Sequence, residues 1–149
     1  MKNSIKKKDK NENKIVDLDN ENNHIGLKSI KCSHEGRINS ILKLKNGNLI
    51  SSSDFKILEW NLIEKTEVRY IDTEKYKFTP KCLYEIEENL LAVGGYSRIG
   101  ILELEKNNFK YFLKCPGSDI IGIQYYNDNL GRNLLIWCSI SYLVVFNLI

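Results

Sequence analysis

The sequence offers few side chains whose types and spacing suit catalysis or metal binding. Its two histidines are His24 and His34, and its four cysteines are Cys32, Cys82, Cys115 and Cys138. No two cysteines form a Cys-x-x-Cys pair, and neither histidine stands at a ligand-like spacing from them. A transition-metal site needs such ligands to be clustered. We therefore expect no metal site and no cofactor, with the cysteines reduced and mostly buried.

Two pairs of carboxylates come nearest to an acid and a base within reach of one another. Glu87 and Glu88 fall in a predicted hairpin turn, while Glu103 and Glu105 share one face near the end of a predicted strand. Carboxylates at such positions are usually solvated, whereas catalysis needs an activated nucleophile or an acid and a base held within reach of one another. Gly94-Gly95 lies inside a hairpin, so it is no phosphate-binding loop. We expect the protein not to be an enzyme; use of a central channel for catalysis is the least favoured alternative.

The net charge of +3 is concentrated near the N-terminus. Residues 1–31 hold eight lysines and five acidic side chains, whereas residues 32–149 hold 14 of each sign. The folded part therefore lacks the basic stripe typical of nucleic-acid binding. Residues 1–24 are expected to be a disordered leader, and Lys6, Lys7 and Lys8 leave a membrane-surface or polyanion-binding role as an alternative. No apolar stretch reaches the roughly 20 residues of a membrane span, and no secretory signal is present, which favours the cytoplasm.

An internal repeat organises the rest of the chain. Residues 49–62, 91–104 and 135–148 superimpose without gaps, and each copy has an apolar run, a small polar turn and a second apolar run. That pattern is typical of a tight β-hairpin. Further strands are predicted before each copy, at residues 38–44, 81–86 and 120–126, and after the first two, at residues 66–71 and 108–114. Four short strands per 40–45 residues indicate a propeller blade.

The turns between these strands have their own signals. Asn46-Gly47 predicts a type I′ hairpin turn, because both residues tolerate positive φ. The corresponding turn of the second repeat falls at residues 87–89, and the third repeat is predicted to have a longer loop at residues 127–133.

The first repeat resembles a WD-repeat. The resemblance rests on Ser33-His34, the strand at residues 38–44, Asn46-Gly47, the turn at residues 51–54 and the run Ile57-Leu58-Glu59-Trp60-Asn61. It implies a buried hydrogen-bonded tetrad of His34, Ser52, Asp54 and Trp60. The usual Gly-His and Trp-Asp pairs of the family are Ser-His and Trp-Asn here. The later repeats lack the tetrad: the second has Tyr76, Tyr96 and Leu102 at three of its positions, and the third has Ile140 and Phe146 at two.

The predicted fold is all-β, a segment of about three four-stranded WD-repeat-like blades. Residues 25–32 are predicted to be a closing outer strand, followed by blades at residues 33–74, 75–116 and 117–149. Closed propellers have about 4–8 blades, so three do not complete a ring. Three explanations remain open: the chain is a fragment of a longer propeller, two copies form a homodimeric six-blade ring, or another protein supplies the missing blades.

The function that this fold favours is a non-catalytic protein–protein interaction or assembly scaffold. The resemblance to WD-repeat proteins implies a protein or peptide partner, bound by loops on one face of the propeller. Aromatic and arginine side chains are the usual anchors of such interfaces. The candidate partner-binding residues are Arg37, Phe55, Lys56, Tyr76, Tyr96, Arg98 and Tyr142. Among them, Tyr96 and Arg98 are predicted to be the strongest pair.

Overall fold

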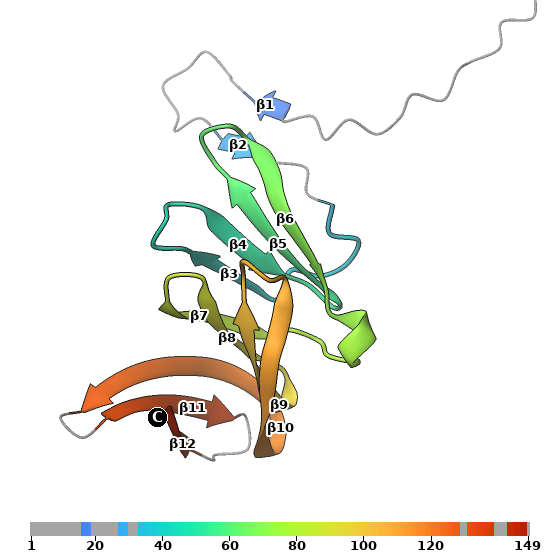
Figure 1. Cartoon of the computed structure of the whole chain (residues 1–149). Coiled ribbons are helices and arrows are strands. Elements are labelled where there is room, and N and C mark those ends of the chain that lie inside the picture. The colour runs from blue at the N-terminus through green and yellow to red at the C-terminus, as the bar shows by residue number, and fades with distance from the viewer. Residues whose placement is uncertain (1–15, 19–26, 30–32, 129–130, 139–142, 149) are drawn as a thin grey trace, which may run out of the picture. The chain divides into compact units, whose positions relative to one another are not determined.

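The structure is a computed structural model that describes residues 16–18, 27–29, 33–128, 131–138 and 143–148 (Figure 1). The chain divides into two units, residues 1–33 and residues 34–149. In the first unit, β1 (Val16–Leu18) pairs antiparallel with β2 (Leu27–Ser29). No helix in the described segments is long and apolar enough to cross a membrane.

The predictions for this first unit concern residues that the structure describes only in part. Strand β1 lies inside residues 1–24, which we predicted to be a disordered leader, while residues 1–15 and 19–24 are outside the described residues. Strand β2 lies within the closing strand predicted at residues 25–32. Its partner in the described structure is β1 rather than a strand of a blade.

The first blade is a four-stranded antiparallel sheet with the order β3-β4-β5-β6 (Figure 1). Its strands are β3 (Ser40–Lys43), β4 (Leu49–Ser52), β5 (Lys56–Asn61) and β6 (Thr66–Asp72). These agree with the strands predicted from the repeat. A single 3-10 turn, η1 (Glu74–Tyr76), leads from β6 into the next sheet.

The second and third repeats form one six-stranded antiparallel sheet. Its strands are β7 (Cys82–Glu87), β8 (Leu90–Gly94), β9 (Tyr96–Glu103), β10 (Asn108–Asp128), β11 (Gly131–Cys138) and β12 (Leu143–Leu148). Strand β10 pairs with β9 along its first part and with β11 along its second, and Figure 1 shows it turning from one to the other. The pairing with β9 is irregular between Lys114 and Asp119, around Pro116, which has no N–H to donate.

Two turn predictions are wrong. At Asn46-Gly47, only Gly47 has a positive φ, and Gly47 N–H donates to the Leu44 carbonyl over 3.0 Å, which gives a three-residue loop rather than a type I′ turn. The longer loop predicted at residues 127–133 is also absent, because β10 continues to Asp128 and β11 begins at Gly131.

An apolar core joins the first blade to the second repeat. Because side chains alternate across a strand, one face of the first blade is apolar and packs on its neighbour. The buried members of this core are Leu44, Ile50, Ile57, Ile71, Phe78, Leu83, Leu91, Val93, Leu102, Leu104 and Phe109.

An ion pair within the first blade includes an arginine that reaches across the same junction. The carboxylate of Glu59 is 3% exposed and accepts hydrogen bonds from Arg69 Nε at 2.8 Å and Asn48 Nδ2 at 2.7 Å. Burial by itself would raise the pKa of Glu59. The hydrogen bonds from Asn48 and Arg69 lower it by more than burial raises it, so the pKa of Glu59 lies below its ordinary value. The Arg69 guanidinium also donates to the Leu104 carbonyl and, at 2.9 Å, to the Asn107 side chain. One arginine therefore links β6 to the turn between β9 and β10.

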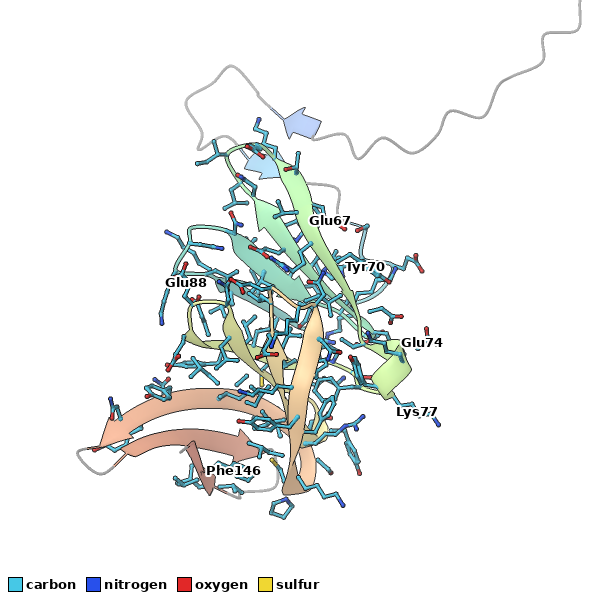
Figure 2. The ribbon with its side chains drawn as sticks, viewed as in Figure 1. Glu67, Tyr70, Glu74, Lys77, Glu88 and Phe146 are labelled. Carbon is cyan, nitrogen blue, oxygen red and sulfur yellow. The ribbon has the colours of Figure 1, made fainter. Side chains whose placement is uncertain are left out.

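Apolar side chains remain exposed at both ends of this second unit. On the first blade, Ile41 and Tyr70 are exposed, and each is next in sequence to a residue that packs in the core. Neighbouring side chains of a strand point to opposite faces, so Ile41 and Tyr70 project from the face away from the core. Figure 2 labels Tyr70 on β6. On β12, Phe146 packs against the second repeat, while Leu143 and Val145 are exposed. Each end presents a sheet face with no blade packed on it among the described residues.

The ion pair gives a stability prediction. Arg69→Met leaves the Glu59 carboxylate buried without its cation, so we expect a loss of about 3 kcal/mol in the free energy of unfolding, measured by urea denaturation. The double variant Glu59→Leu/Arg69→Met removes both charges and should recover most of that loss. A double variant as unstable as Arg69→Met would contradict this account.

The exposed end faces give a second prediction. Because apolar sheet faces of this kind drive association, the purified chain should have a solution mass above that of a monomer by light scattering. Tyr70→Lys/Val145→Lys places a charge on each face and should shift the chain toward the monomer. If the unmodified chain were a stable monomer, the end faces would not be association surfaces.

Candidate functional site

A hollow lies where the first strands of successive repeats begin. Its lining residues are Arg37, Asn39, Lys81, Asp119 and Ile121, and we call it the strand-start hollow. Arg37 and Asn39 precede β3, and Lys81 precedes β7. Asp119 and Ile121 lie where β10 leaves β9 and begins to pair with β11. All three repeats therefore contribute to one site.

Backbone hydrogen bonds fix these positions in a repeated way. Asn39 N–H donates to the Ser52 carbonyl over 2.8 Å, and Lys81 N–H donates to the Gly94 carbonyl over 2.7 Å. These two bonds occupy equivalent places in the first and second repeats. The Asn39 side chain also donates to the Pro80 carbonyl at 2.9 Å, which joins the two walls of the hollow.

A glycine allows the third wall to approach. A Cβ atom on Gly94 would overlap the Cys82 sulfur and lie 2.8 Å from the Ile120 side chain. Ile120 N–H donates to the Gly95 carbonyl over 3.0 Å, which attaches β10 next to the hollow. Gly94 and Gly95 thus have a packing role, in agreement with their predicted place in a hairpin.

The charges in the hollow are available to a ligand. Within the part of the chain that the structure describes, the charged groups of Arg37, Lys81 and Asp119 make no ion pair or hydrogen bond. The lining thus carries two cations and one carboxylate, with a net charge of +1. Exposed apolar surface adjoins them: Ile121 is 59% exposed, and Tyr96, which is 67% exposed, pairs with Asp119 across the sheet.

A second hollow lies beside the turn between β4 and β5. It is lined by Glu35, Gly36, Ser53, Asp54, Phe55, Lys56 and Glu74. Two predicted partner-binding residues, Phe55 and Lys56, are therefore here, and Figure 2 labels Glu74 at the 3-10 turn. The ammonium of Lys56 is paired with the Glu35 carboxylate at 2.9 Å, and this hydrogen bond raises the pKa of Lys56. This hollow is predominantly acidic, unlike the strand-start hollow.

The predicted pair of Tyr96 and Arg98 is divided in the structure. Tyr96 faces solvent, whereas the Arg98 guanidinium stacks on Phe78 and Phe112, at 5.2 and 4.8 Å from the ring centroids. Arg98 also donates to the Tyr76 carbonyl at 2.7 Å and to the Lys77 carbonyl. These contacts hold Arg98 within the second repeat, because the carbonyls accept its N–H groups and the two rings cover the face of its guanidinium.

Tyr76, also a predicted partner-binding residue, belongs to the same aromatic cluster. Its ring meets that of Phe109 edge to face at a centroid distance of 5.1 Å, and its hydroxyl is hydrogen-bonded to Asn108. Tyr142 lies outside the described residues. Of the seven predicted partner-binding residues, Arg37 lines the strand-start hollow, and Tyr96 lies beside it as the cross-strand partner of Asp119.

The predicted tetrad is altered in two of its four members. Ser51, not Ser52, joins the chain: Trp60 Nε1–H donates to Ser51 Oγ at 3.0 Å, and His34 Nε2 lies 2.8 Å from the same oxygen. His34 Nδ1 lies 2.7 Å from Ser53 Oγ, the place predicted for Asp54, whose side chain is exposed. The reason is alternation along the strand, which puts Ser51 and Trp60 on one face and Ser52 on the other.

The electrostatics of His34 suit this structural role. Burial lowers the pKa of His34, and the nearby Lys56 charge lowers it further. The neutral ring then has one donor and one acceptor nitrogen, which fits the two serine hydroxyls on either side.

Sequence reasoning missed Lys81, Asn39, Asp119 and Ile121 as site residues. Lys81 stands at the place in the second repeat that Asn39 occupies in the first, so the repeat offset was a usable signal for that pair. No such signal marked Asp119, because its position depends on where β10 changes partners.

The two serines give a matched test. Ser51→Ala removes the hydroxyl that bridges His34 and Trp60, and we expect it to cost about 1–3 kcal/mol of unfolding free energy. The Ser52 hydroxyl is buried with no partner among the described residues, so Ser52→Ala should be neutral or slightly stabilising. Thermal unfolding of both variants decides the matter, and a larger loss in Ser52→Ala would restore the original prediction.

No protein-family model and no curated protein matches the sequence. Solved structures do match. The chain superimposes on U3-55K with a TM-score of 0.64 at 15% identity, covering 78% of this chain and 37% of the other. A chain of the mitotic checkpoint complex matches with a TM-score of 0.68 at 14% identity, covering 89% and 42%.

A third match is the computationally designed Ika4 protein, with a TM-score of 0.51 at 13% identity. This alignment covers 77% of the chain and 93% of Ika4. By contrast, the chain spans only about two fifths of the length of the first two proteins, which are WD-repeat propellers. The chain therefore has an all-β fold similar to part of a WD-repeat propeller.

Proposed function

We propose that the chain is a non-catalytic interaction scaffold that binds a peptide segment of a protein partner at the strand-start hollow. The observation that carries the proposal is the convergence of three repeats on one hollow whose charged groups have no partner in the described structure. Rigid strands position the lining, and the exposed Tyr96 beside it is the type of side chain that anchors interfaces.

The composition of the hollow favours binding over catalysis. Its lining has two cations, a carboxylate, an amide and an isoleucine, and it contains no nucleophile next to a base. The structural neighbours support a scaffold at the level of the fold, and one of them was solved as part of a complex. We place this activity in the cytoplasm.

The alternative role in polyanion or membrane-surface binding depends on Lys6, Lys7 and Lys8, which lie outside the described residues. It stays a prediction from composition.

Selection from a random peptide library displayed on phage tests the scaffold proposal. The immobilised full chain should enrich peptides whose synthetic copies bind in solution. Tyr96→Ala should weaken that binding about tenfold or more, as expected for an aromatic anchor. Tyr111→Ala is the matched control, because Tyr111 is also exposed but pairs with Ile101, whereas Tyr96 pairs with the lining residue Asp119. Peptides that bind both variants equally well would place the binding surface elsewhere and refute the proposal.

A further inference from the structure

We infer that the peptide recognised at the strand-start hollow is acidic, with one side-chain carboxylate bound between Arg37 and Lys81. This inference rests on the proposed scaffold function and adds the chemical class of the partner.

The two cations come from neighbouring repeats and line the same hollow. Arg37 offers a planar fork of N–H donors, and Lys81 offers a compact ammonium; both groups bind carboxylates through charge-assisted hydrogen bonds. Neither has an ion-pair partner among the residues described here. The Asn39 amide nitrogen donates to the Pro80 carbonyl and so fixes the wall between them.

Asp119 limits the kind of anion that fits. Its carboxylate lines the same hollow, so a ligand with several negative charges would be repelled by it. A peptide has a different pattern: one acidic side chain can meet the cations while a backbone N–H or a basic side chain meets Asp119. The balance of 14 basic and 14 acidic side chains over residues 32–149 also disfavours a phosphate backbone as the ligand.

Apolar surface next to the charges completes the site. Ile121 lines the hollow and Tyr96 pairs with Asp119 across the sheet, so a residue adjacent to the acidic one would contact both. The inferred ligand is therefore a peptide in which an acidic residue adjoins an apolar one.

The second hollow supplies a control cation. Lys56 is already paired with Glu35 and lies among the carboxylates of Asp54 and Glu74. Lys56→Gln therefore removes one positive charge from the chain, as Arg37→Gln and Lys81→Gln do, without removing one from the strand-start hollow.

The test compares two pools of fluorescein-labelled, end-blocked hexapeptides on the full chain by fluorescence anisotropy. All positions are randomised except the third, which is Glu in one pool and Gln in the other. The Glu pool should bind about tenfold more tightly. Arg37→Gln and Lys81→Gln should each remove this preference, whereas Lys56→Gln should retain it. Thermal unfolding confirms that the variants are folded.

The outcomes separate the two proposals. Equal binding of the pools, or a Glu preference that survives both hollow variants, overturns the acidic inference; if that binding is weakened by Tyr96→Ala, the scaffold proposal stands. Tighter binding of a thymidine oligonucleotide than of the Glu pool also overturns the acidic inference. If Tyr96→Ala weakens the binding of neither pool, both proposals are overturned.

Discussion

A four-stranded blade is a single sheet, and it buries a broad apolar face by packing against another element. The rest of the structure depends on this constraint. Strands β4 and β5 direct Ile50 and Ile57 toward the second repeat, and the core between the two sheets is continuous. The same packing brings the starts of β3 and β7 side by side, and the strand-start hollow lies between them. Site and core are thus consequences of one contact between sheets.

The first two repeats stabilise the same corner by different chemistry. In the first, His34, Ser51 and Trp60 form a directional chain of hydrogen bonds. In the second, Tyr76 occupies the place of His34, and edge-to-face rings packed under Arg98 take over. Hydrogen bonds require donors and acceptors at fixed positions, whereas aromatic packing tolerates more variation in the sequence. This difference coincides with the resemblance to a WD-repeat, which the first repeat has and the second lacks.

Periodic features of the fold were predictable from the sequence, and local geometry was less so. The hairpins at residues 49–62 and 91–104 follow from alternating apolar residues, so their strands were predicted correctly. The choice between Ser51 and Ser52 depends on which face of β4 each serine occupies, and a run of three serines conceals that alternation. The continuous course of β10 was also hidden, because Pro116-Gly117 suggests a break in a strand that the structure carries through. Asp119 reaches the hollow through that course.

The length of β10 has a consequence for how the repeats are joined. The first blade meets the second repeat through side-chain packing, the hydrogen bonds of Arg69 and Asn39, and the short 3-10 turn, and these two sheets share no strand. The second and third repeats share β10, which pairs with β9 over residues 108–119 and with β11 over residues 120–128. The second and third repeats are therefore joined by the backbone of one strand as well as by a shared core, whereas the first blade and the second repeat are joined by side-chain contacts.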